Sequence, residues 1–375
     1  MLPTLEHQQL VMLSLSLSYS YKTSPIDLDA LIKSTNRRVC AKIRVISVTD
    51  LVSLVYAAAR QQLLDVKYIT FLLTEITARV EELPVDSFAR LLFALCSHAE
   101  KFGDFFTFLL QEFPIQKCPL TELPKFGAML MSLEPAVKLQ MQEECNAVIR
   151  RILIGRKLKH STILQVPLYF AIGDILKVST LNLWLECLSE RKELFSDAGE
   201  SQDAGDREDA IDPLLRCRAV MTAKLLAVHF EATANVLSST AQAFLKSAEQ
   251  FPMFIPEDRD VLFSSQLPGV LDFSKTSGYK KLRNAMRLNG LLPFLQPATV
   301  GPFYLTRANE KKKFCVLLDD APGFEPQIVP MRKIRKEFLI NQGWDVLSVT
   351  MDELQTRESE VVANVWKRFG EGWRQ

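Results

Sequence analysis

The sequence lacks the long apolar stretch that a membrane-spanning helix requires. No run of 18 or more uncharged apolar residues occurs among its 375 residues, and the nearest candidate, residues 10–21, is too short. No basic region precedes that candidate and no small-residue cleavage site is evident, so we do not interpret it as a secretory signal. The N-terminal residues also lack the Arg- and Ser-rich character of a transit peptide. We therefore expect no membrane span.

Motifs for nucleophilic catalysis and for nucleotide binding are also missing. The sequence contains no GxSxG elbow and no glycine-rich phosphate loop of the Walker type. Three of its four histidines, His98, His160 and His229, stand apart from other candidate catalytic residues. We therefore expect no enzymatic activity of these kinds, no cofactor and no small-molecule substrate.

The cysteines occur singly and never as a CxxC pair. Their number is odd, and most have apolar neighbours, as buried free thiols do. This pattern favours a reducing compartment, and it gives no short ligand spacing for zinc. The seven positions are Cys40, Cys96, Cys118, Cys145, Cys187, Cys217 and Cys315.

Charge is balanced overall but unevenly distributed. The formal net charge is +1, yet residues 274–375 contain 17 Lys and Arg against 11 Asp and Glu. The part of the chain before residue 274 is therefore acidic. This asymmetry places the expected contact with a polyanion near the C-terminus.

Apolar residues recur at helical spacing from about residue 5 to residue 195. Four helices begin after a residue able to cap an N-terminus, and their first apolar residues are 37, 35 and 40 positions apart. Those first residues are Leu51, Phe88, Leu123 and Ile163. Second helices follow, for example at 68–82 and 104–112.

A period of this length made of helix pairs is typical of an α-solenoid, because one helical hairpin cannot bury its own apolar face. We thus predict a mostly α protein with an α-solenoid of 35–40-residue helical-hairpin repeats over residues 1–195. A non-repetitive helical bundle is the alternative.

Three further segments follow the predicted solenoid. Residues 196–212 are acidic and have almost no large apolar side chains, so we predict an exposed loop. An alternative is an electrostatic decoy that competes for the basic C-terminal surface. Residues 213–273 are expected to form further helices and a proline-rich connector, and residues 274–375 a separate module.

The layout of that last module is strand, basic helix, glycine, strand, helix. We predict strands at 314–320 and 344–349, a helix at 331–341 that Gly343 ends, and a closing helix from about Ser359. Before them we expect a basic helix at residues 278–290 and a hairpin of residues 301–306 with 313–319.

These residues resemble the RAP domain, a family found at the C-termini of organellar RNA-binding proteins. The resemblance rests on a basic pair, Arg335 and Lys336, followed by Leu339, Gly343 and the aromatic Trp344. It implies a small α/β fold related to the PD-(D/E)XK endonucleases, and a place in mitochondrial or plastid RNA metabolism. The helix pairs are similar in shape to the loose helical repeats that accompany RAP domains.

Because the RAP fold is related to endonucleases, the sequence must be searched for the carboxylates of a nuclease site. Such enzymes hold Mg²⁺ with clustered carboxylates. Asp319 and Asp320 end the first of the two strands, but Leu317 stands where the family has a preceding Glu. The next strand offers only Asp345 and no E-x-K. We therefore expect a non-catalytic protein in which the acid pair turns or caps the chain.

Basic residues of the module are the candidate RNA contacts, because phosphate contacts need exposed cations and no fixed spacing. On the predicted helix, Arg332 and Lys336 are one turn apart and should share a face, with Ile334 and Phe338 toward the sheet. A solvated face partly paired with Glu337 is the alternative. The candidates form three groups: Lys280, Lys281 and Arg283, with Arg287; Lys311, Lys312 and Lys313; and Arg332, Lys333, Arg335 and Lys336.

Aromatic residues near these groups have two interpretations. Tyr279, Phe303, Tyr304 and Trp344 have the ring surfaces on which unpaired bases stack. For Trp344 we favour a place in the core of the module.

The resemblance therefore implies a non-catalytic RNA-binding protein of the mitochondrial matrix. The near-neutral net charge suits a component of a mitochondrial ribosome or other ribonucleoprotein, which we expect to bind ribosomal RNA with one end and proteins with the rest. Two alternatives remain: a helical-repeat scaffold without RNA contact, and a Mg²⁺-dependent nuclease of the PD-(D/E)XK type.

Overall fold

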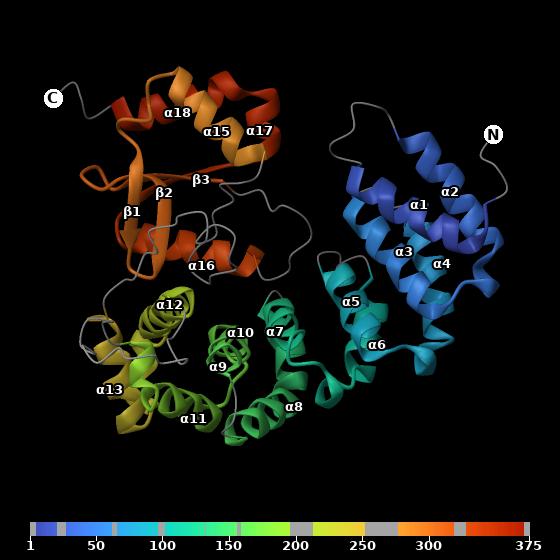
Figure 1. Ribbon diagram of the computed structural model, residues 1–375, viewed down its shortest axis with the longest axis horizontal. Coiled ribbons are helices and arrows are strands. Elements are labelled where there is room, and N and C mark those ends of the chain that lie inside the picture. Colours follow the sequence, from blue (N-terminus) through green and yellow to red (C-terminus); the bar gives the residue numbers. More distant parts are fainter. Residues whose placement is uncertain are drawn as a thin grey trace, which may run out of the picture. The chain divides into compact units, whose positions relative to one another are not determined.

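A computed structural model shows a mostly helical protein with one four-stranded mixed sheet near its C-terminus (Figure 1). It describes residues 5–20, 28–61, 66–96, 102–131, 133–155, 159–195, 213–251, 277–318 and 328–370. The expected mostly α fold with a small C-terminal α/β module is therefore confirmed. The predicted acidic loop and most of the proline-rich connector lie outside the described residues. The chain divides into two compact units, Met1–Val148 and Ile149–Gln375.

The N-terminal unit consists of successive helices joined by short connections. Helix α1 contacts α3, α3 contacts α5, and α5 contacts α7, while α2, α4 and α6 each pack on the helix that precedes them. The bounds are α1 His7–Ser20, α2 Asp29–Ala41, α3 Val48–Gln61, α4 Val66–Thr77, α5 Val85–Cys96, α6 Gly103–Glu112, α7 Leu123–Met131 and α8 Pro135–Ile154, with 3-10 turns η1 Ile43–Val45, η2 Val80–Glu82 and η3 Ile115–Lys117.

Helix α3 shows why this unit folds. Its predicted apolar positions Leu51, Leu54 and Val55 are at most 1% exposed. Between α3 and α5, the guanidinium of Arg90 lies 4.7 Å from the ring centroid of Tyr56.

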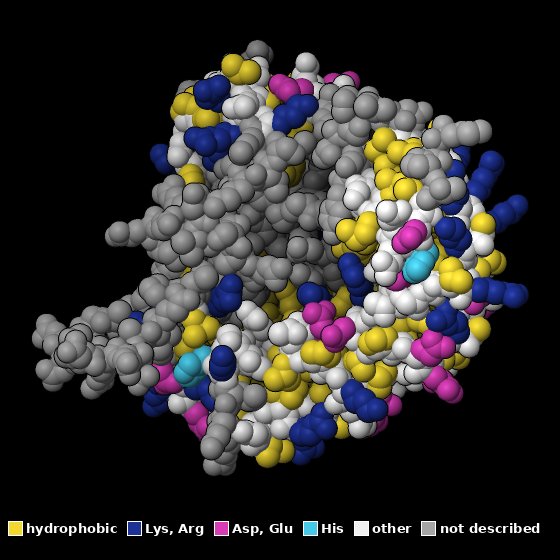
Figure 2. Space-filling model, turned by 45° about the vertical axis from the view of Figure 1, so that its right-hand side comes forward, with side chains coloured by type: hydrophobic (Ala, Val, Ile, Leu, Met, Phe, Trp, Pro, Cys, Tyr) yellow, Lys and Arg dark blue, Asp and Glu magenta, His cyan; other side chains and the backbone are white. Residues whose placement is uncertain are grey.

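Lys and Arg side chains project from the right-hand side of Figure 2, where the N-terminal helices come forward.

The start of α3 differs from the sequence expectation. The cap is Ser47, whose Oγ accepts a hydrogen bond from the backbone N–H of Asp50 at 3.1 Å, so the helix begins before Leu51. Thr49 and Asp50, the expected capping residues, lie within its first turn. The predicted second helices, in contrast, are confirmed as α4 with η2 and as α6. That the helix pairs are true repeats stays a prediction.

The helices of the second unit pack around Trp184, which is completely buried and donates its indole N–H to the carbonyl of Ile163 at 2.7 Å. Pro213 is the first residue of α12, as predicted, because proline fits the first helical turn. Helix α12 contacts α9 and α13, and α11 also contacts α13. The bounds are α9 His160–Gln165, α10 Leu168–Ile172, α11 Val178–Ser189, η4 Lys192–Leu194, α12 Pro213–His229, η5 Glu231–Val236 and α13 Ser239–Ala248.

The α/β module has strand order β1-β2-β3-β4. Strands β1, β2 and β3 are antiparallel neighbours, and β4 pairs parallel to β3 after a crossover through α16. The bounds are α15 Ser277–Leu288, β1 Gln296–Val300, β2 Phe303–Asn309, β3 Phe314–Leu318, α16 Ile328–Asn341, β4 Asp345–Val349, α17 Met351–Thr356 and α18 Glu358–Gly370. The expected strands, basic helices and closing helix are confirmed, whereas β1 and α17 were not predicted.

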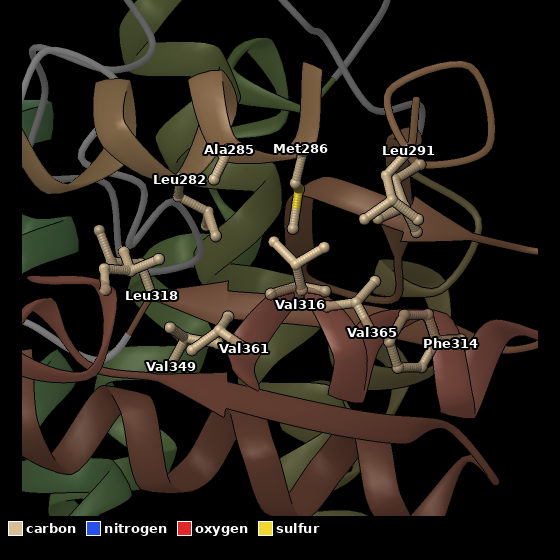
Figure 3. Packing of buried hydrophobic residues seen from close by; sticks show 13 residues of the cluster. Leu282, Ala285, Met286, Leu291, Phe314, Val316, Leu318, Val349, Val361 and Val365 are labelled. Carbon is tan, nitrogen blue, oxygen red and sulfur yellow. The ribbon is translucent and has the colours of Figure 1, made fainter. Parts of the chain in front are cut away.

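The sheet is covered on both faces (Figure 1). Helices α15, α17 and α18 lie on one face, and Figure 3 shows Phe314, Val316 and Leu318 of β3 packed with Met286 of α15 and Val365 of α18. Successive side chains of a strand point to opposite faces. The residues of β3 between these three therefore face α16 on the other side.

Gly343 ends α16 as predicted. Its φ of +78° is in the left-handed region, which glycine adopts without steric cost. The N–H of Trp344 donates to the carbonyl of Leu339, and the N–H of Gly343 donates to that of Ile340, both at 2.9 Å. This is the Schellman pair of hydrogen bonds, which satisfies the last carbonyls of the helix and directs the chain into β4.

We expect Gly343→Ala to lower the free energy of unfolding by about 1–2 kcal/mol, because a Cβ destabilises the left-handed conformation. Urea denaturation followed by tryptophan fluorescence measures this loss. The matched control is Gly103→Ala, since no atom lies within 4 Å of an added Cβ at that position. Equal midpoints for Gly343→Ala and wild type would contradict the role of the glycine.

Candidate nucleic-acid interface

The three predicted basic groups lie on three different elements. The first is on α15, the second is in the turn between β2 and β3, and the third is on α16. Helices α15 and α16 cover opposite faces of the sheet, as Figure 1 shows. The structure therefore does not bring all of the candidates onto one surface.

The α16 group itself divides between two faces of the helix. Lys333 and Lys336 are exposed, while Arg332 is half-buried and Arg335 is only 3% exposed. Arg335, one of the candidate RNA contacts, is therefore buried and not exposed as a phosphate contact requires. Residues 332, 335 and 339 follow helical spacing along the side that faces the sheet, and Leu339 is completely buried there.

Arg335 lies close to the thiol of Cys315 in β3. Burial raises the pKa of this thiol to about 12, and the positive charge of Arg335 acts in the opposite direction. Because Arg335 is 3% exposed and lies on the same side of α16 as the buried Leu339, its guanidinium lies in the layer between α16 and the sheet and is not available to a ligand in water.

Phe338 holds α16 against the β1–β2 turn. Its ring centroid lies 5.5 Å from that of Phe303, and a Cβ added to Gly301 would lie 2.6 Å from the ring Cζ. Gly301 has a φ of +55°, so glycine serves both the turn and the close approach of the ring. The expectation that Phe338 points toward the sheet is confirmed.

The β2–β3 turn is tied to the C-terminal end of α16. Lys313 Nζ donates to the carbonyl of Gln342 at 3.0 Å, and the backbone N–H of Asp345 donates to the carbonyl of Lys313 at 2.7 Å. A cation at this position also complements the helix dipole. Lys311 is exposed and Lys312 is half-buried. These contacts place the turn lysines beside the end of α16 that also carries Lys336.

The α15 group covers the other side of the module. Arg283 and Arg287 are exposed one helical turn apart, and Lys281 is half-buried. The structure does not describe the side chains of Lys280 and Tyr279. This group can contribute to a second surface, separated by the sheet from that of α16.

The aromatic candidates with described side chains belong to the core. Phe303, Tyr304 and Trp344 are 0%, 6% and 8% exposed, so little ring surface is left for a base to stack on. The preference for Trp344 as a core residue is confirmed.

The acidic residues that a nuclease would need are not brought together by the described residues. Leu317 is buried, and Asp345 Oδ1 accepts a hydrogen bond from Arg368 Nη1 at 2.7 Å on the α18 side of the sheet. No three His, Cys, Asp or Glu side chains within the described ranges lie close enough to hold a metal ion. Asp319 and Asp320 lie outside those ranges.

No model of a known protein family matches the chain, and no curated protein is significantly similar to it. Among the helices of the described residues, none combines the length and the apolar character needed to cross a bilayer.

One cationic segment was missed by the sequence analysis. Residues 30–49 contain five Lys and Arg and no Asp or Glu. The positive charge of this segment was not recognised because net charge was counted over all of residues 1–273, which are acidic on average. A shorter window would have detected it.

The cysteines allow a chemical test of the described packing. Burial raises the pKa of Cys118 and of Cys315 to about 12 and that of Cys217 to about 11, so all three thiols stay protonated at pH 8. Thiolates are the reactive species, and Cys40 and Cys187 are only half-buried.

We expect iodoacetamide at pH 8 to modify Cys40 and Cys187 of the native protein at least tenfold faster than the buried Cys118, Cys217 and Cys315, measured by peptide mass spectrometry. In urea all five should react at similar rates. Rapid modification of Cys315 in the native protein would show that the layer beneath α16 is open.

Proposed function

We propose that this protein binds RNA without catalysis, through the phosphate backbone, as part of a mitochondrial ribosome or another ribonucleoprotein of the mitochondrial matrix. The supporting observation is the contact between Lys313 and the end of α16, because it joins two of the predicted basic groups into one surface. We call the exposed lysines of that surface, Lys333, Lys336, Lys311 and Lys313, the α16 basic surface.

The dimensions of this surface suit a polyanion. Lys333 and Gln342 are nine residues apart, so the lysines extend over roughly 14 Å of helix length at 1.5 Å per residue. Phosphate contacts require exposed cations along such a path and no base-specific geometry. A backbone-directed, sequence-independent mode of binding is therefore the one that these residues favour.

The charge of the surface indicates weak binding. Lys333 Nζ lies 3.9 Å from Glu337 Oε1, and both side chains are well exposed, at 77% and 60%. An exposed pair of this kind contributes little stability and is easily exchanged for a phosphate contact. With so few cations, the affinity should be modest and depend only moderately on salt.

The organellar assignment rests on the resemblance to RAP domains. That resemblance was based on an order of elements: a strand, a basic helix, Gly343 with Trp344, a second strand and a helix. The structure has the same order in β3, α16, β4 and α18. The helix pairs of the N-terminal unit support the proposed α-solenoid of 35–40-residue repeats, because α1, α3, α5 and α7 contact one another in sequence.

A role without catalysis is supported by Leu317. It occupies the position at which the RAP family has a Glu, and it is 4% exposed in the core of the sheet. A leucine cannot bind a metal ion, and Asp345 of the neighbouring strand is engaged by Arg368.

We expect the double variant Lys333→Glu and Lys336→Glu to weaken binding to a 20-nucleotide single-stranded RNA. Removing two phosphate contacts should make the slope of log K against log salt shallower by about 1.4, at about 0.7 per contact. Fluorescence anisotropy at several salt concentrations measures this slope. Both side chains are exposed, so circular dichroism should show an unchanged fold.

The matched control is Arg283→Glu with Arg287→Glu, which makes the same change of charge on the opposite side of the sheet. Weaker binding of the α16 variant alone supports the proposal. Equal losses in both variants would show a diffuse effect of net charge, and the absence of binding in wild type would exclude RNA contact.

A further inference from the structure

A cationic face of α2 lies outside the α/β module. Lys33, Arg37 and Arg44 are exposed, and we call these three residues the α2 basic surface. Lys33 and Arg37 are one helical turn apart, and Arg44 follows in η1 after α2. Within α2, the four positions from Lys33 to Arg37 correspond to roughly 6 Å at helical rise.

The packing of α2 explains why these cations face water. Ile32, Thr35 and Val39 are at most 3% exposed and follow the spacing i, i+3, i+7, so they form the inner stripe of the helix. Helix α2 packs on α1. Residues 33 and 37 therefore lie on the outer side of the helix.

In the described part of the chain, no hydrogen bond or ion pair links Lys33, Arg37 or Arg44, the three cations of the α2 basic surface, to a carboxylate. Lys42, in contrast, has a structural role, because its Nζ donates to the carbonyl of Leu5 at 2.7 Å. We therefore exclude Lys42 from the surface.

The surrounding sequence makes this surface distinctive. Residues 1–148 contain 14 Lys and Arg against 16 Asp and Glu, yet residues 30–49 hold 5 of those cations and none of the acids. The remainder of the unit thus has 9 cations against 16 acids. A positive patch on an acidic unit attracts a polyanion locally while the rest of the unit repels it.

The chemistry of the face favours a phosphodiester backbone over a membrane. A membrane-bound amphipathic helix inserts an apolar face, but the apolar stripe of α2 is buried within the protein. Val45 is the one large apolar residue that residues 30–49 expose among the described side chains. Phosphates need only cations spaced along a path, which this face provides.

We propose that the α2 basic surface is a second RNA-backbone contact, on the unit that does not contain the α/β module. The proposal depends on the proposed function in that RNA is the polyanion, and it adds a site that does not involve α16. Figure 2 shows Lys and Arg side chains where the N-terminal helices come forward in that view.

The test is the triple variant Lys33→Glu, Arg37→Glu and Arg44→Glu in the full-length chain. Loss of three phosphate contacts should make the salt slope of binding to a 20-nucleotide single-stranded RNA shallower by about 2, at about 0.7 per contact. Affinity at low salt should fall at least tenfold. The matched control is Lys67→Glu, Lys117→Glu and Lys246→Glu, with the same change of net charge at scattered exposed positions.

Comparison with the α16 double variant separates the two proposals. A loss in the α2 variant but not in the α16 variant supports the α2 surface and overturns the α16 basic surface. The reverse result overturns the α2 surface and leaves the proposed function standing. Equal losses in the α2 variant and the scattered control overturn the α2 surface as well.

Two further probes test the class of partner. We expect wild type to prefer the RNA over vesicles containing phosphatidylserine and over polyglutamate, and the triple variant to lose that preference. If wild type binds the vesicles more tightly than the RNA, and the triple variant does not, the surface is assigned to a membrane. The same result with polyglutamate assigns it to an acidic protein. Either result would overturn the proposal.

Discussion

The contact between α16 and the sheet is the constraint on which the C-terminal module depends. Parallel pairing of β3 with β4 requires a crossover, and α16 is that crossover. The ring of Phe338 packs so closely on Gly301 that a larger residue there would displace the ring, and the Schellman turn at Gly343 directs the chain back into the sheet. Together these contacts fix which side of α16 is buried.

That orientation also decides which cations reach water. With Leu339 buried against the sheet, the helical period places Arg335 beside Cys315 and leaves Lys333 and Lys336 outside. The same contacts bring Lys313 to the carbonyl of Gln342. A basic sequence on a helix therefore contributes to binding only through the residues that packing leaves exposed.

Helices α2 and α16 can be compared position by position. Each has an inner stripe at i, i+3, i+7, formed by Ile32, Thr35 and Val39 in α2. The outer positions i+1 and i+5 of α2 are Lys33 and Arg37, whereas those of α16 are Lys333 and Glu337, which form an ion pair. At these two outer positions α2 therefore carries two cations and α16 carries an ion pair, although residues 274–375 have the larger positive charge.

Much of the module was predictable because its signals are local. The apolar run of β3, the glycine after α16 and the apolar run of β4 each specify structure within a few residues. Strand β1 was missed because it is an edge strand with a proline at position 297 and one fully buried residue, Ala298. Helix α17 has the capping box of Thr350 and Glu353, but its six residues are too few for a helical period to be recognised.

The candidate site was less predictable, because burial of a charged side chain depends on tertiary contacts. Arg335 is one helical turn before Leu339, but a charged residue at that position is expected to face water, and only the packing of α16 on β3 shows that it is buried. The contact between Lys313 and Gln342 joins residues 29 positions apart, and it exists because β4 returns beside β3. Composition could identify a basic module but could not show which of its cations share a surface.

If RNA binds both of the surfaces proposed on α16 and α2, each would strengthen the binding of the other. When one surface holds an RNA strand, the second meets the same strand at an effective concentration set by the length and stiffness of what connects them, so the combined affinity can exceed either affinity by orders of magnitude. Each surface needs few cations for this, which agrees with a net charge of only +1. The acidic remainder of the chain then limits binding elsewhere, because it repels polyanions that do not engage both surfaces.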